Sequence, residues 1–227
     1  MPKPGRLLPI ITALFVTALL TANIIAVKLI VVAGVVLPAG VVIFPLSYLF
    51  GDVLTEVYGY AQTRRVIWLG FFCNLLMVVA IWIAQGLPSA PFWKGQDAYD
   101  AILGFAPRLL FASFVAYLIG EFANSFVLAK LKIATRGRWL WTRTIGSTAV
   151  GQALDSAVFV TLAFAGAGVP DLGSVILAQW LFKSAYEIVA TPLTYLVVNT
   201  LKRLEGIDTF DHGTNFSPVV IGASDAS

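Results

Sequence analysis

Long runs of apolar residues, separated by short polar segments, make up most of this chain. Six runs reach the length of about 20 residues that a membrane helix needs to cross a hydrocarbon core of about 30 Å. They cover residues 7–33, 37–58, 66–86, 107–131, 145–167 and 173–201. The pattern predicts an all-α, polytopic membrane protein with six transmembrane helices in residues 1–204, and a polar cytoplasmic tail in residues 205–227.

The composition agrees with this interpretation. Apolar residues make up 59% of the chain and charged residues only 12%, whereas soluble domains carry about a quarter charged residues. The first apolar run is too long for a cleavable signal peptide, and no small-residue cleavage site follows it. We therefore expect it to be retained as a helix.

Basic residues divide unevenly between the two sides of such a six-helix chain. Eleven of the fifteen lysines and arginines flank the termini or lie in the connections after the second and fourth runs. Lys94 and Arg108 fall on the other side, and Lys28 and Lys183 lie inside runs. The positive-inside rule then predicts that both termini are cytoplasmic. Topology and anionic lipid account for the net charge of +3, without a nucleic-acid partner.

Outside the runs, few features suggest separate chemistry. The longest connection, 87–106, carries aromatic and acidic residues and reads either as an interfacial amphipathic segment or as a lid over an outward-facing cavity. Cys73 is alone within a run, so we expect a packing role and no disulfide. His212 lies near Asp208 and Asp211, and this favours a capped turn over a metal site.

Ionisable residues inside the apolar runs are the strongest functional signal. A charge at the centre of a membrane helix costs about 2.5–3.5 kcal/mol on insertion scales. The runs nevertheless contain five acids, Asp52, Glu56, Glu121, Asp155 and Glu187, against two bases, Lys28 and Lys183. Because pairing cannot neutralise all five acids, the excess indicates a path for a solute or an ion.

Spacing of three or four residues collects these groups and several amides onto shared helix faces. The candidate substrate-binding residues are Asn23, Lys28, Tyr48, Asp52, Glu56, Glu121, Asn124, Gln152, Asp155, Lys183, Tyr186 and Glu187. Structural alternatives stay open: Lys183 with Glu187 could form a self-neutralising pair, Lys28 could brace an acid of the second run, and the amides could join helices.

A carboxylate accepts two hydrogen bonds from an amidine-like edge such as that of guanine, an amide can donate to the adjacent carbonyl, and an aromatic ring can stack on the base. The same acids would suit a cationic amine or a translocated proton. From the residues alone, the substrate is a small polar or cationic solute.

Several segments together resemble the queuosine-precursor transporter family within the wider vitamin-uptake transporters. They are TANIIAVKL (21–29), FPLSYLFGDVLTEVYGYAQTRR (44–65), YLIGEFANSFVLAKLK (117–132), RTIGSTAVGQALDSAVF (143–159), KSAYEIVATPLTYLVVNTLKRLE (183–205) and FDHGTNFSP (210–218). The resemblance implies a multi-pass protein of the bacterial inner membrane that imports 7-cyano-7-deazaguanine and 7-aminomethyl-7-deazaguanine, without a cofactor.

On that substrate we expect the carboxylates of Asp155 and Glu121 to read the guanine-like edge, with Asn23, Asn124 and Gln152 as amide partners. Asp52 and Glu56 would bind the 7-substituent or carry a coupling proton, and Lys183 with Glu187 would form a gate or brace.

The mode of transport is left open. One hypothesis is a self-sufficient facilitator or proton-coupled carrier. The alternative is the substrate-binding subunit of an energy-coupling-factor importer, which docks its ATPase-driven partner through small residues of its first helix. Ala18, Ala22 and Ala26 form such a stripe, which could equally serve a homodimer or internal packing. An enzyme is disfavoured because catalytic motifs such as HExxH and GxSxG are missing.

Overall fold

The structure, a computed structural model, describes residues 5–32, 35–104, 107–166 and 171–219. Its elements are α1 (Leu8–Ile25), β1 (Leu29–Val32), β2 (Val35–Pro38), η1 (Ala39–Val42), α2 (Phe44–Tyr58), α3 (Tyr60–Gly86), α4 (Gln96–Leu103), α5 (Pro107–Ala134), α6 (Leu140–Phe164) and α7 (Leu172–Glu205). The predicted helical class is confirmed, with one small β-hairpin added.

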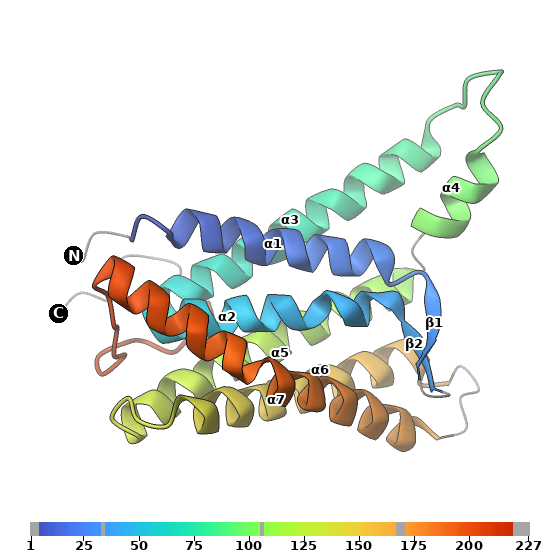
Figure 1. The fold of residues 1–227 in the computed structure, drawn as a ribbon. Helices are drawn as coiled ribbons and strands as arrows, with labels where there is room; N and C mark the ends of the chain where they lie inside the picture. The colour runs from blue at the N-terminus through green and yellow to red at the C-terminus, as the bar shows by residue number, and fades with distance from the viewer. Residues whose placement is uncertain (1–4, 33–34, 105–106, 167–170, 220–227) are drawn as a thin grey trace.

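The long helices form a bundle with two distinct ends (Figure 1). At one end the Leu7 N–H, just before α1, donates a hydrogen bond of 2.7 Å to Glu205 at the end of α7. We call this the termini end, and the opposite end, where β1 and β2 pair, the hairpin end. The connections after α2, α5 and α7 lie at the termini end, so the basic residues predicted to share one side do so as far as they are described; Lys3 lies outside the described residues.

α2 is the central helix of the bundle. It contacts α1, α3, α5 and α7, and 12 of its 15 residues are buried. Fifteen residues rise only about 22 Å, so α2 alone is shorter than a hydrocarbon core of about 30 Å. The acid-rich segment seen in the sequence is therefore enclosed by other helices rather than facing lipid.

The predicted runs 7–33 and 37–58 are wrong as continuous helices. α1 ends at Ile25, and the strands Leu29–Val32 and Val35–Pro38 pair in antiparallel fashion, with Leu29 opposite Pro38 and Val32 opposite Val35. The segment LIVV…VVLP is rich in β-branched residues, which are stiff at χ1 and favour strands. Apolar character alone could not distinguish this hairpin from the end of a helix.

Within the described residues, four helical regions are long and apolar enough to cross a membrane: Leu8–Ile25, Tyr60–Gly86, Leu140–Phe164 and the region Gln96–Ala134, which contains α4 and α5 on either side of the undescribed residues 105–106. α2 is too short by itself, and α7 carries polar residues along its middle and a proline, Pro192. The protein is thus a multi-pass helical membrane protein. The count of six spans stays a prediction that depends on α2 and α7.

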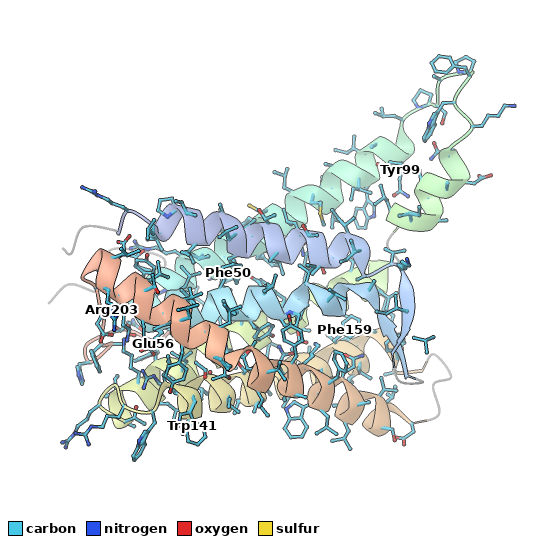
Figure 2. The ribbon with its side chains drawn as sticks, in the orientation of Figure 1. Phe50, Glu56, Tyr99, Trp141, Phe159 and Arg203 are labelled. Atoms are coloured by element: carbon cyan, nitrogen blue, oxygen red, sulfur yellow. The ribbon has the colours of Figure 1, made fainter. Side chains whose placement is uncertain are left out.

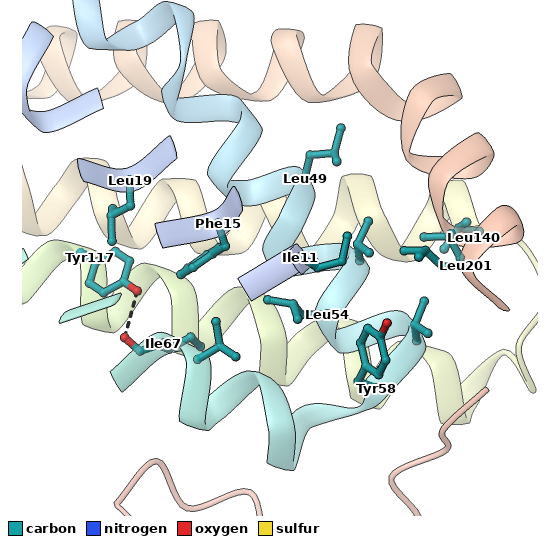
Figure 3. Packing of buried hydrophobic residues seen from close by; sticks show 14 residues of the cluster. Ile11, Phe15, Leu19, Leu49, Leu54, Tyr58, Ile67, Tyr117, Leu140 and Leu201 are labelled. Carbon is teal, nitrogen blue, oxygen red and sulfur yellow. Dashed lines mark hydrogen bonds between the residues drawn. The ribbon is translucent and has the colours of Figure 1, made fainter. Parts of the chain in front are cut away.

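The apolar core joins α1, α2 and α3 to α5 (Figure 3). Phe15 and Leu54 are fully or almost fully buried there, and the buried Tyr117 hydroxyl donates to the Ile67 carbonyl at 3.0 Å. Deeper in the bundle, α5 and α6 cross closely: a Cβ added to Gly120 would meet the Asp155 Cβ at 2.8 Å and the Gly151 carbonyl at 3.1 Å. Because a larger side chain at position 120 would clash with α6, the crossing requires glycine there.

The hairpin-end half of α3 leans away from the bundle and carries α4 beside it (Figure 1). Exposed side chains such as Leu76 and Ile83 give this half an apolar surface suited to lipid. α4 has no buried residue, and Phe92 before it is 87% exposed. These features fit the interfacial interpretation of residues 87–106.

The tail does not simply leave the bundle, because residues 206–219 fold back against α3 and α5. Asp211 accepts the Tyr60 N–H through both carboxylate oxygens at 3.1 Å, and so caps the start of α3. The Arg64 guanidinium donates to the carbonyls of Asn215 and Ser217. The predicted capped turn is confirmed for Asp211, and residues 220–227 of the predicted disordered tail end lie outside the described residues.

Candidate functional site

A cavity of about 150 Å³ opens in the hairpin-end half of the bundle. α1, η1, α2, α5, α6 and α7 all contribute to its walls. Its polar lining comes from Asn23, Ser113, Tyr117, Asp155, Gln179 and Lys183, and its aromatic lining from Phe44, Phe159 and Phe182. Figure 2 places Phe159 in this half, and Glu56 and Arg203 near the termini end. Such a mixture of apolar walls and a few convergent polar groups is typical of small-molecule sites.

An ion pair marks one wall of the cavity. The Lys183 ammonium on α7 donates to Asp155 Oδ2 on α6 at 2.5 Å, and it lies 4.9 Å from the centre of the Phe44 ring. The predicted pairing of Lys183 with Glu187 along α7 is therefore wrong in this conformation. Because the two side chains are only 16% and 7% exposed, the pair is largely removed from water yet borders the cavity.

A second group of polar side chains lies between the cavity and the termini end. Asn124 on α5 donates to Asp52 Oδ1 on α2 at 2.8 Å and lies 3.5 Å from the Thr148 hydroxyl on α6. Glu121, one turn from Asn124, is fully buried and points at α2, where a Cβ on Gly51 would lie 3.0 Å from Glu121 Oε2. Close helix packing thus brings the acids of two helices together.

Several atoms of this second group have no hydrogen-bond partner among the described residues. These are Tyr48 Oη, Asp52 Oδ2, both carboxylate oxygens of Glu121, Gln152 Oε1, Ser156 Oγ and Glu187 Oε1. Buried polar groups in folded proteins are nearly always hydrogen-bonded. A concentration of unsatisfied groups beside a cavity therefore indicates a place for a solute, water or protons.

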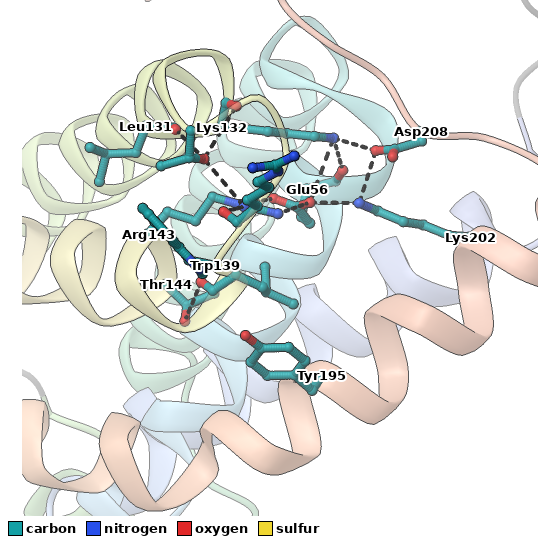
Figure 4. Close-up of polar contacts among 12 residues, drawn as sticks. Glu56, Leu131, Lys132, Trp139, Arg143, Thr144, Tyr195, Lys202 and Asp208 are labelled. Atoms are coloured by element: carbon teal, nitrogen blue, oxygen red, sulfur yellow. Dashed lines mark hydrogen bonds and ion pairs between the residues drawn. The ribbon is translucent and has the colours of Figure 1, made fainter.

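Glu56 belongs to a different structure, an ion cluster at the termini end (Figure 4). The Arg143 guanidinium donates to both of its carboxylate oxygens, at 2.7 and 2.8 Å, and the Lys202 ammonium lies 2.6 Å from Oε1. Lys132 donates to the Glu56 carbonyl and to Asp208. These five residues, which join α2, α5, α6, α7 and the tail, are called the ion cluster below.

Asp208 lies outside the membrane-spanning helices, and its titration is set by this cluster. Burial alone would raise the pKa of its carboxyl, but hydrogen bonds from Lys132 and Lys202 outweigh that effect and hold the pKa below the usual value. The Asp208 side chain is still 47% exposed. The carboxylate therefore stays charged at neutral pH and links the tail to α5 and α7.

The structure brings some of the predicted site residues together and separates others. Asn23, Asp155 and Lys183 line the cavity, whereas Tyr48, Asp52, Glu121, Asn124, Gln152 and Glu187 form or border the deeper group. Lys28 is exposed at the hairpin end, beyond the end of α1, and Tyr186 is partly buried away from the cavity lining. The Glu56 carboxylate is paired with Arg143 and Lys202, so Glu56 links helices at the termini end and does not line the cavity.

Some residues with clear roles were missed by the sequence reasoning. Lys132, Arg143 and Lys202 were assigned to topology alone, although each lies at the termini-side end of its helix, level with Glu56. Asn74 on α3 was not among the candidate residues, yet it accepts a hydrogen bond from Asn23 at 3.2 Å. Gln179 in the cavity wall had a usable signal, since it precedes Lys183 by four residues on one helix face.

Comparison with known proteins supplies the context for this geometry. A family model described as "Putative vitamin uptake transporter" matches residues 38–197, well over half of the chain. The chain belongs to the vitamin uptake transporter family. This membership identifies it as a transporter rather than an enzyme.

Curated relatives of this vitamin uptake transporter carry a more specific name. A "Probable queuosine precursor transporter" of Bacillus subtilis (strain 168) is 30% identical over 180 residues, covering 78% of this chain and 79% of the relative. A "Queuosine precursor transporter" of Escherichia coli (strain K12) is 28% identical over 124 residues, covering 53% and 52%. A "Probable queuosine precursor transporter" of Haemophilus influenzae (strain ATCC 51907 / DSM 11121 / KW20 / Rd) is 26% identical over 172 residues, covering 72% and 69%. No solved structure matches the chain.

The small-residue stripe on α1 of the transporter packs inside the molecule. Ala18 and Ala22 are buried, and a Cβ on Gly40 of η1 would meet the Ala22 carbonyl at 2.6 Å and the Ala26 Cβ at 3.1 Å. Ala22 and Ala26 also line the cavity. This face of α1 is therefore occupied by the transporter's own chain.

Proposed function

We propose that this transporter imports 7-deazaguanine precursors of queuosine, such as 7-cyano-7-deazaguanine and 7-aminomethyl-7-deazaguanine, across a bacterial inner membrane. The names of the three curated relatives support the substrate class. In the proposed topology α2 and α7 complete six spans and the termini end faces the cytoplasm, because the termini end carries most of the basic residues.

The observation that carries the proposal is the carboxylate of Asp155 on a cavity wall, with aromatic rings and amides around it. A guanine-like base presents N1–H and an exocyclic amine as two parallel donors, and one carboxylate can accept both. The side-chain amides of Asn23 and Gln179 can donate to the adjacent carbonyl, and Phe44 and Phe159 offer flat apolar surfaces to the ring.

The two substrates differ at the 7-position, where an aminomethyl group is cationic and a cyano group is an uncharged acceptor. Both bases present the same N1–H and exocyclic amine to Asp155, and these donors compete with the Lys183 ammonium for its carboxylate. The Lys183–Asp155 pair therefore has to open, at least in part, when either base takes up the carboxylate. Phe44, beneath the ammonium, can retain Lys183 by a cation–π contact while it is displaced.

Equilibrium binding of both bases to the purified transporter tests the assignment. We expect Asp155→Asn to weaken binding at least about tenfold, or about 1.4 kcal/mol, because an amide cannot accept from two donors in the same way. Gln85→Glu, a change of the same size in the exposed end of α3, is the control and should bind like the wild type. Wild-type affinity in Asp155→Asn would exclude Asp155 as the base-reading group.

Uptake into liposomes that contain only this transporter tests its independence from a partner ATPase. The internal packing of the Ala18–Ala22–Ala26 stripe favours an independent carrier over an energy-coupling-factor subunit. Uptake that appears only after an ATPase module is added would reverse this choice.

A further inference from the structure

Four acidic side chains occupy the middle of the bundle with too few partners. Asp52, Glu121, Asp155 and Glu187 come from α2, α5, α6 and α7, and all are buried. Among the described residues only Asp155 has a cation, Lys183. Within the described ranges Asp52 accepts from the Asn124 amide alone, while both oxygens of Glu121 and one of Glu187 have no donor.

Glu121 is the most isolated of these groups. Its side chain lies against Gly51 of α2, near the ring of Phe15 from α1, where no donor is available. Among the described residues, the charged and titratable groups around Glu121 include one cation, Lys183, and that cation is already paired with Asp155. These groups are Tyr48 and Asp52 on α2, Cys73 on α3, Tyr117 on α5, Asp155 on α6, and Lys183 and Glu187 on α7.

The cations of the ion cluster do not relieve this shortage. Arg143 and Lys202 bind the Glu56 carboxylate, and Lys132 is divided among Asp208 and two main-chain carbonyls. An isolated carboxylate buried without partners costs several kcal/mol, and a carboxyl group avoids that cost by holding a proton. Repulsion from the neighbouring acids acts in the same direction.

Glu121 is also next to the substrate cavity. A Cβ on the adjacent Gly120 would lie 3.0 Å from the Tyr48 hydroxyl and 2.8 Å from the Asp155 Cβ. Tyr48 has both Asp155 and Glu121 as electrostatic neighbours, and its hydroxyl has no hydrogen-bond partner in the part of the chain that the structure describes. The Tyr48 hydroxyl is thus suited to pass a proton between the cavity wall and Glu121.

We propose that Glu121 is the proton-carrying carboxyl of a proton-coupled transporter, in contact with the cavity through Tyr48 and Asp155. Glu121 is protonated while the cavity is open at the hairpin end, and it releases the proton on the termini side after the substrate has moved. The inference rests on the proposed import of a 7-deazaguanine base, and it supplies the driving ion for that transport.

A pH gradient across voltage-clamped proteoliposomes tests the coupling. With one proton per substrate, a gradient of one pH unit, worth about 1.4 kcal/mol, drives accumulation of about tenfold. We expect the wild type to reach this level with a 7-deazaguanine base. Glu121→Gln should only equilibrate the base, with an inside-to-outside ratio near one, while substrate counterflow without a gradient, which needs no net proton movement, should remain measurable.

Glu205→Gln is the matched control, since Glu205 lies at the end of α7 and accepts the Leu7 N–H. It should accumulate the base like the wild type. Equal wild-type concentrations inside and outside at every gradient, or tenfold accumulation by Glu121→Gln, would overturn the proposal.

A hydrophobic carbodiimide, which reacts with protonated carboxyl groups, gives a test on the unmodified protein. Peptide mass spectrometry should find Glu121 labelled in preference to Glu56, more strongly at lower pH. Labelling of Glu56 but not of Glu121 contradicts the proposal, including in the case where Glu121→Gln does not fold. If the wild type shows no counterflow of any 7-deazaguanine, the substrate assignment fails, and the labelling still decides on the proton site.

Discussion

At the scale of single residues, the ion pair between Lys183 and Asp155 links affinity to the charge of the substrate. The ammonium already satisfies the carboxylate that the base is proposed to use. Opening the pair costs a charge-assisted hydrogen bond, which is stronger than a neutral one. A cationic substrate brings a positive charge that compensates for the displaced Lys183 ammonium, whereas a neutral substrate does not.

Lys183→Met removes this competing cation while keeping an apolar stem of similar length. We expect the ratio of affinities for the aminomethyl base over the cyano base to rise at least about tenfold, because the Asp155 carboxylate then leaves an unpaired negative charge at the cavity, which attracts the cationic base and not the neutral one. Calorimetric titration of both bases measures the ratio. An unchanged ratio would show that Lys183 does not set the charge that the cavity presents to the substrate.

Asp208 provides a pH-dependent prediction for the ion cluster. Its pKa is lowered in the folded protein, so its contribution to stability is fully present above the unfolded value of about 3.9 and is lost as the pH falls through the folded value. Asp208→Asn should therefore lower the Tm by a constant amount between pH 5 and 7, and the difference should shrink toward pH 3. Tryptophan fluorescence during heating measures it, with Asp97→Asn on α4 as the control. A difference that grows toward pH 3 would contradict the proposed sign.

The candidate site was predictable from the sequence only in part, and single residues show why. An acidic residue inside an apolar run is conspicuous in the sequence because it is costly to place in a membrane helix. Asp155 and Glu121 could therefore be predicted as candidate site residues. The partner of an acid depends on the packing of other helices, and so Lys183 bonds across to Asp155 rather than along α7 to Glu187. Likewise Glu56 could be recognised as unusual, but not as the centre of a cluster with Arg143.

At the scale of elements, the crossing of α5 and α6 determines how closely the acids approach. Gly120 and Gly151 allow the two backbones to meet, and Asn124 and Asp155 lie one turn beyond them. Small residues at such crossings are the usual means of close helix association in membranes. The length of the apolar runs predicted both helices, whereas the paired strands Leu29–Val32 and Val35–Pro38 show that an apolar run alone does not define its secondary structure.

Alanine substitution at this crossing should be costly. In Gly120→Ala the added Cβ lies 2.8 Å from the Asp155 Cβ, and in Gly151→Ala it lies 2.8 Å from the Gly120 carbonyl. Overpacking of this kind costs about 1–3 kcal/mol, and both variants should lose substrate binding because Asp155 moves.

Gly146→Ala on the same helix is the matched control, since its Cβ would meet only Leu131 Cδ1 at 3.5 Å. It should be neutral or slightly stabilising, because glycine weakens a helix relative to alanine. Thermal unfolding in detergent compares the three variants. Equal stability of all three would mean that the helices do not cross so closely.

At the scale of the whole molecule, the cavity and the ion cluster divide the bundle into two unlike halves. The cavity opens among the hairpin-end parts of the helices, whereas the cluster joins α2, α5, α6, α7 and the tail at the other end. A transporter must open to one side at a time. We propose that the structure corresponds to a state open toward the hairpin end and closed by ion pairs at the termini end.

Cysteine accessibility can test this asymmetry in a background where Cys73, the single cysteine, is replaced by serine. Ser113→Cys in the cavity wall should react with a membrane-impermeant thiol reagent added at the hairpin side, whereas Ser147→Cys, fully buried toward the termini end, should not. Adding Glu56→Gln leaves the cluster cations without their central acid, at a cost of about 3–5 kcal/mol. That cost favours opening of the termini end, so Ser147→Cys should then react at least about tenfold faster from the termini side. A Ser147→Cys rate that Glu56→Gln leaves unchanged would show that the ion cluster does not close this end of the transporter.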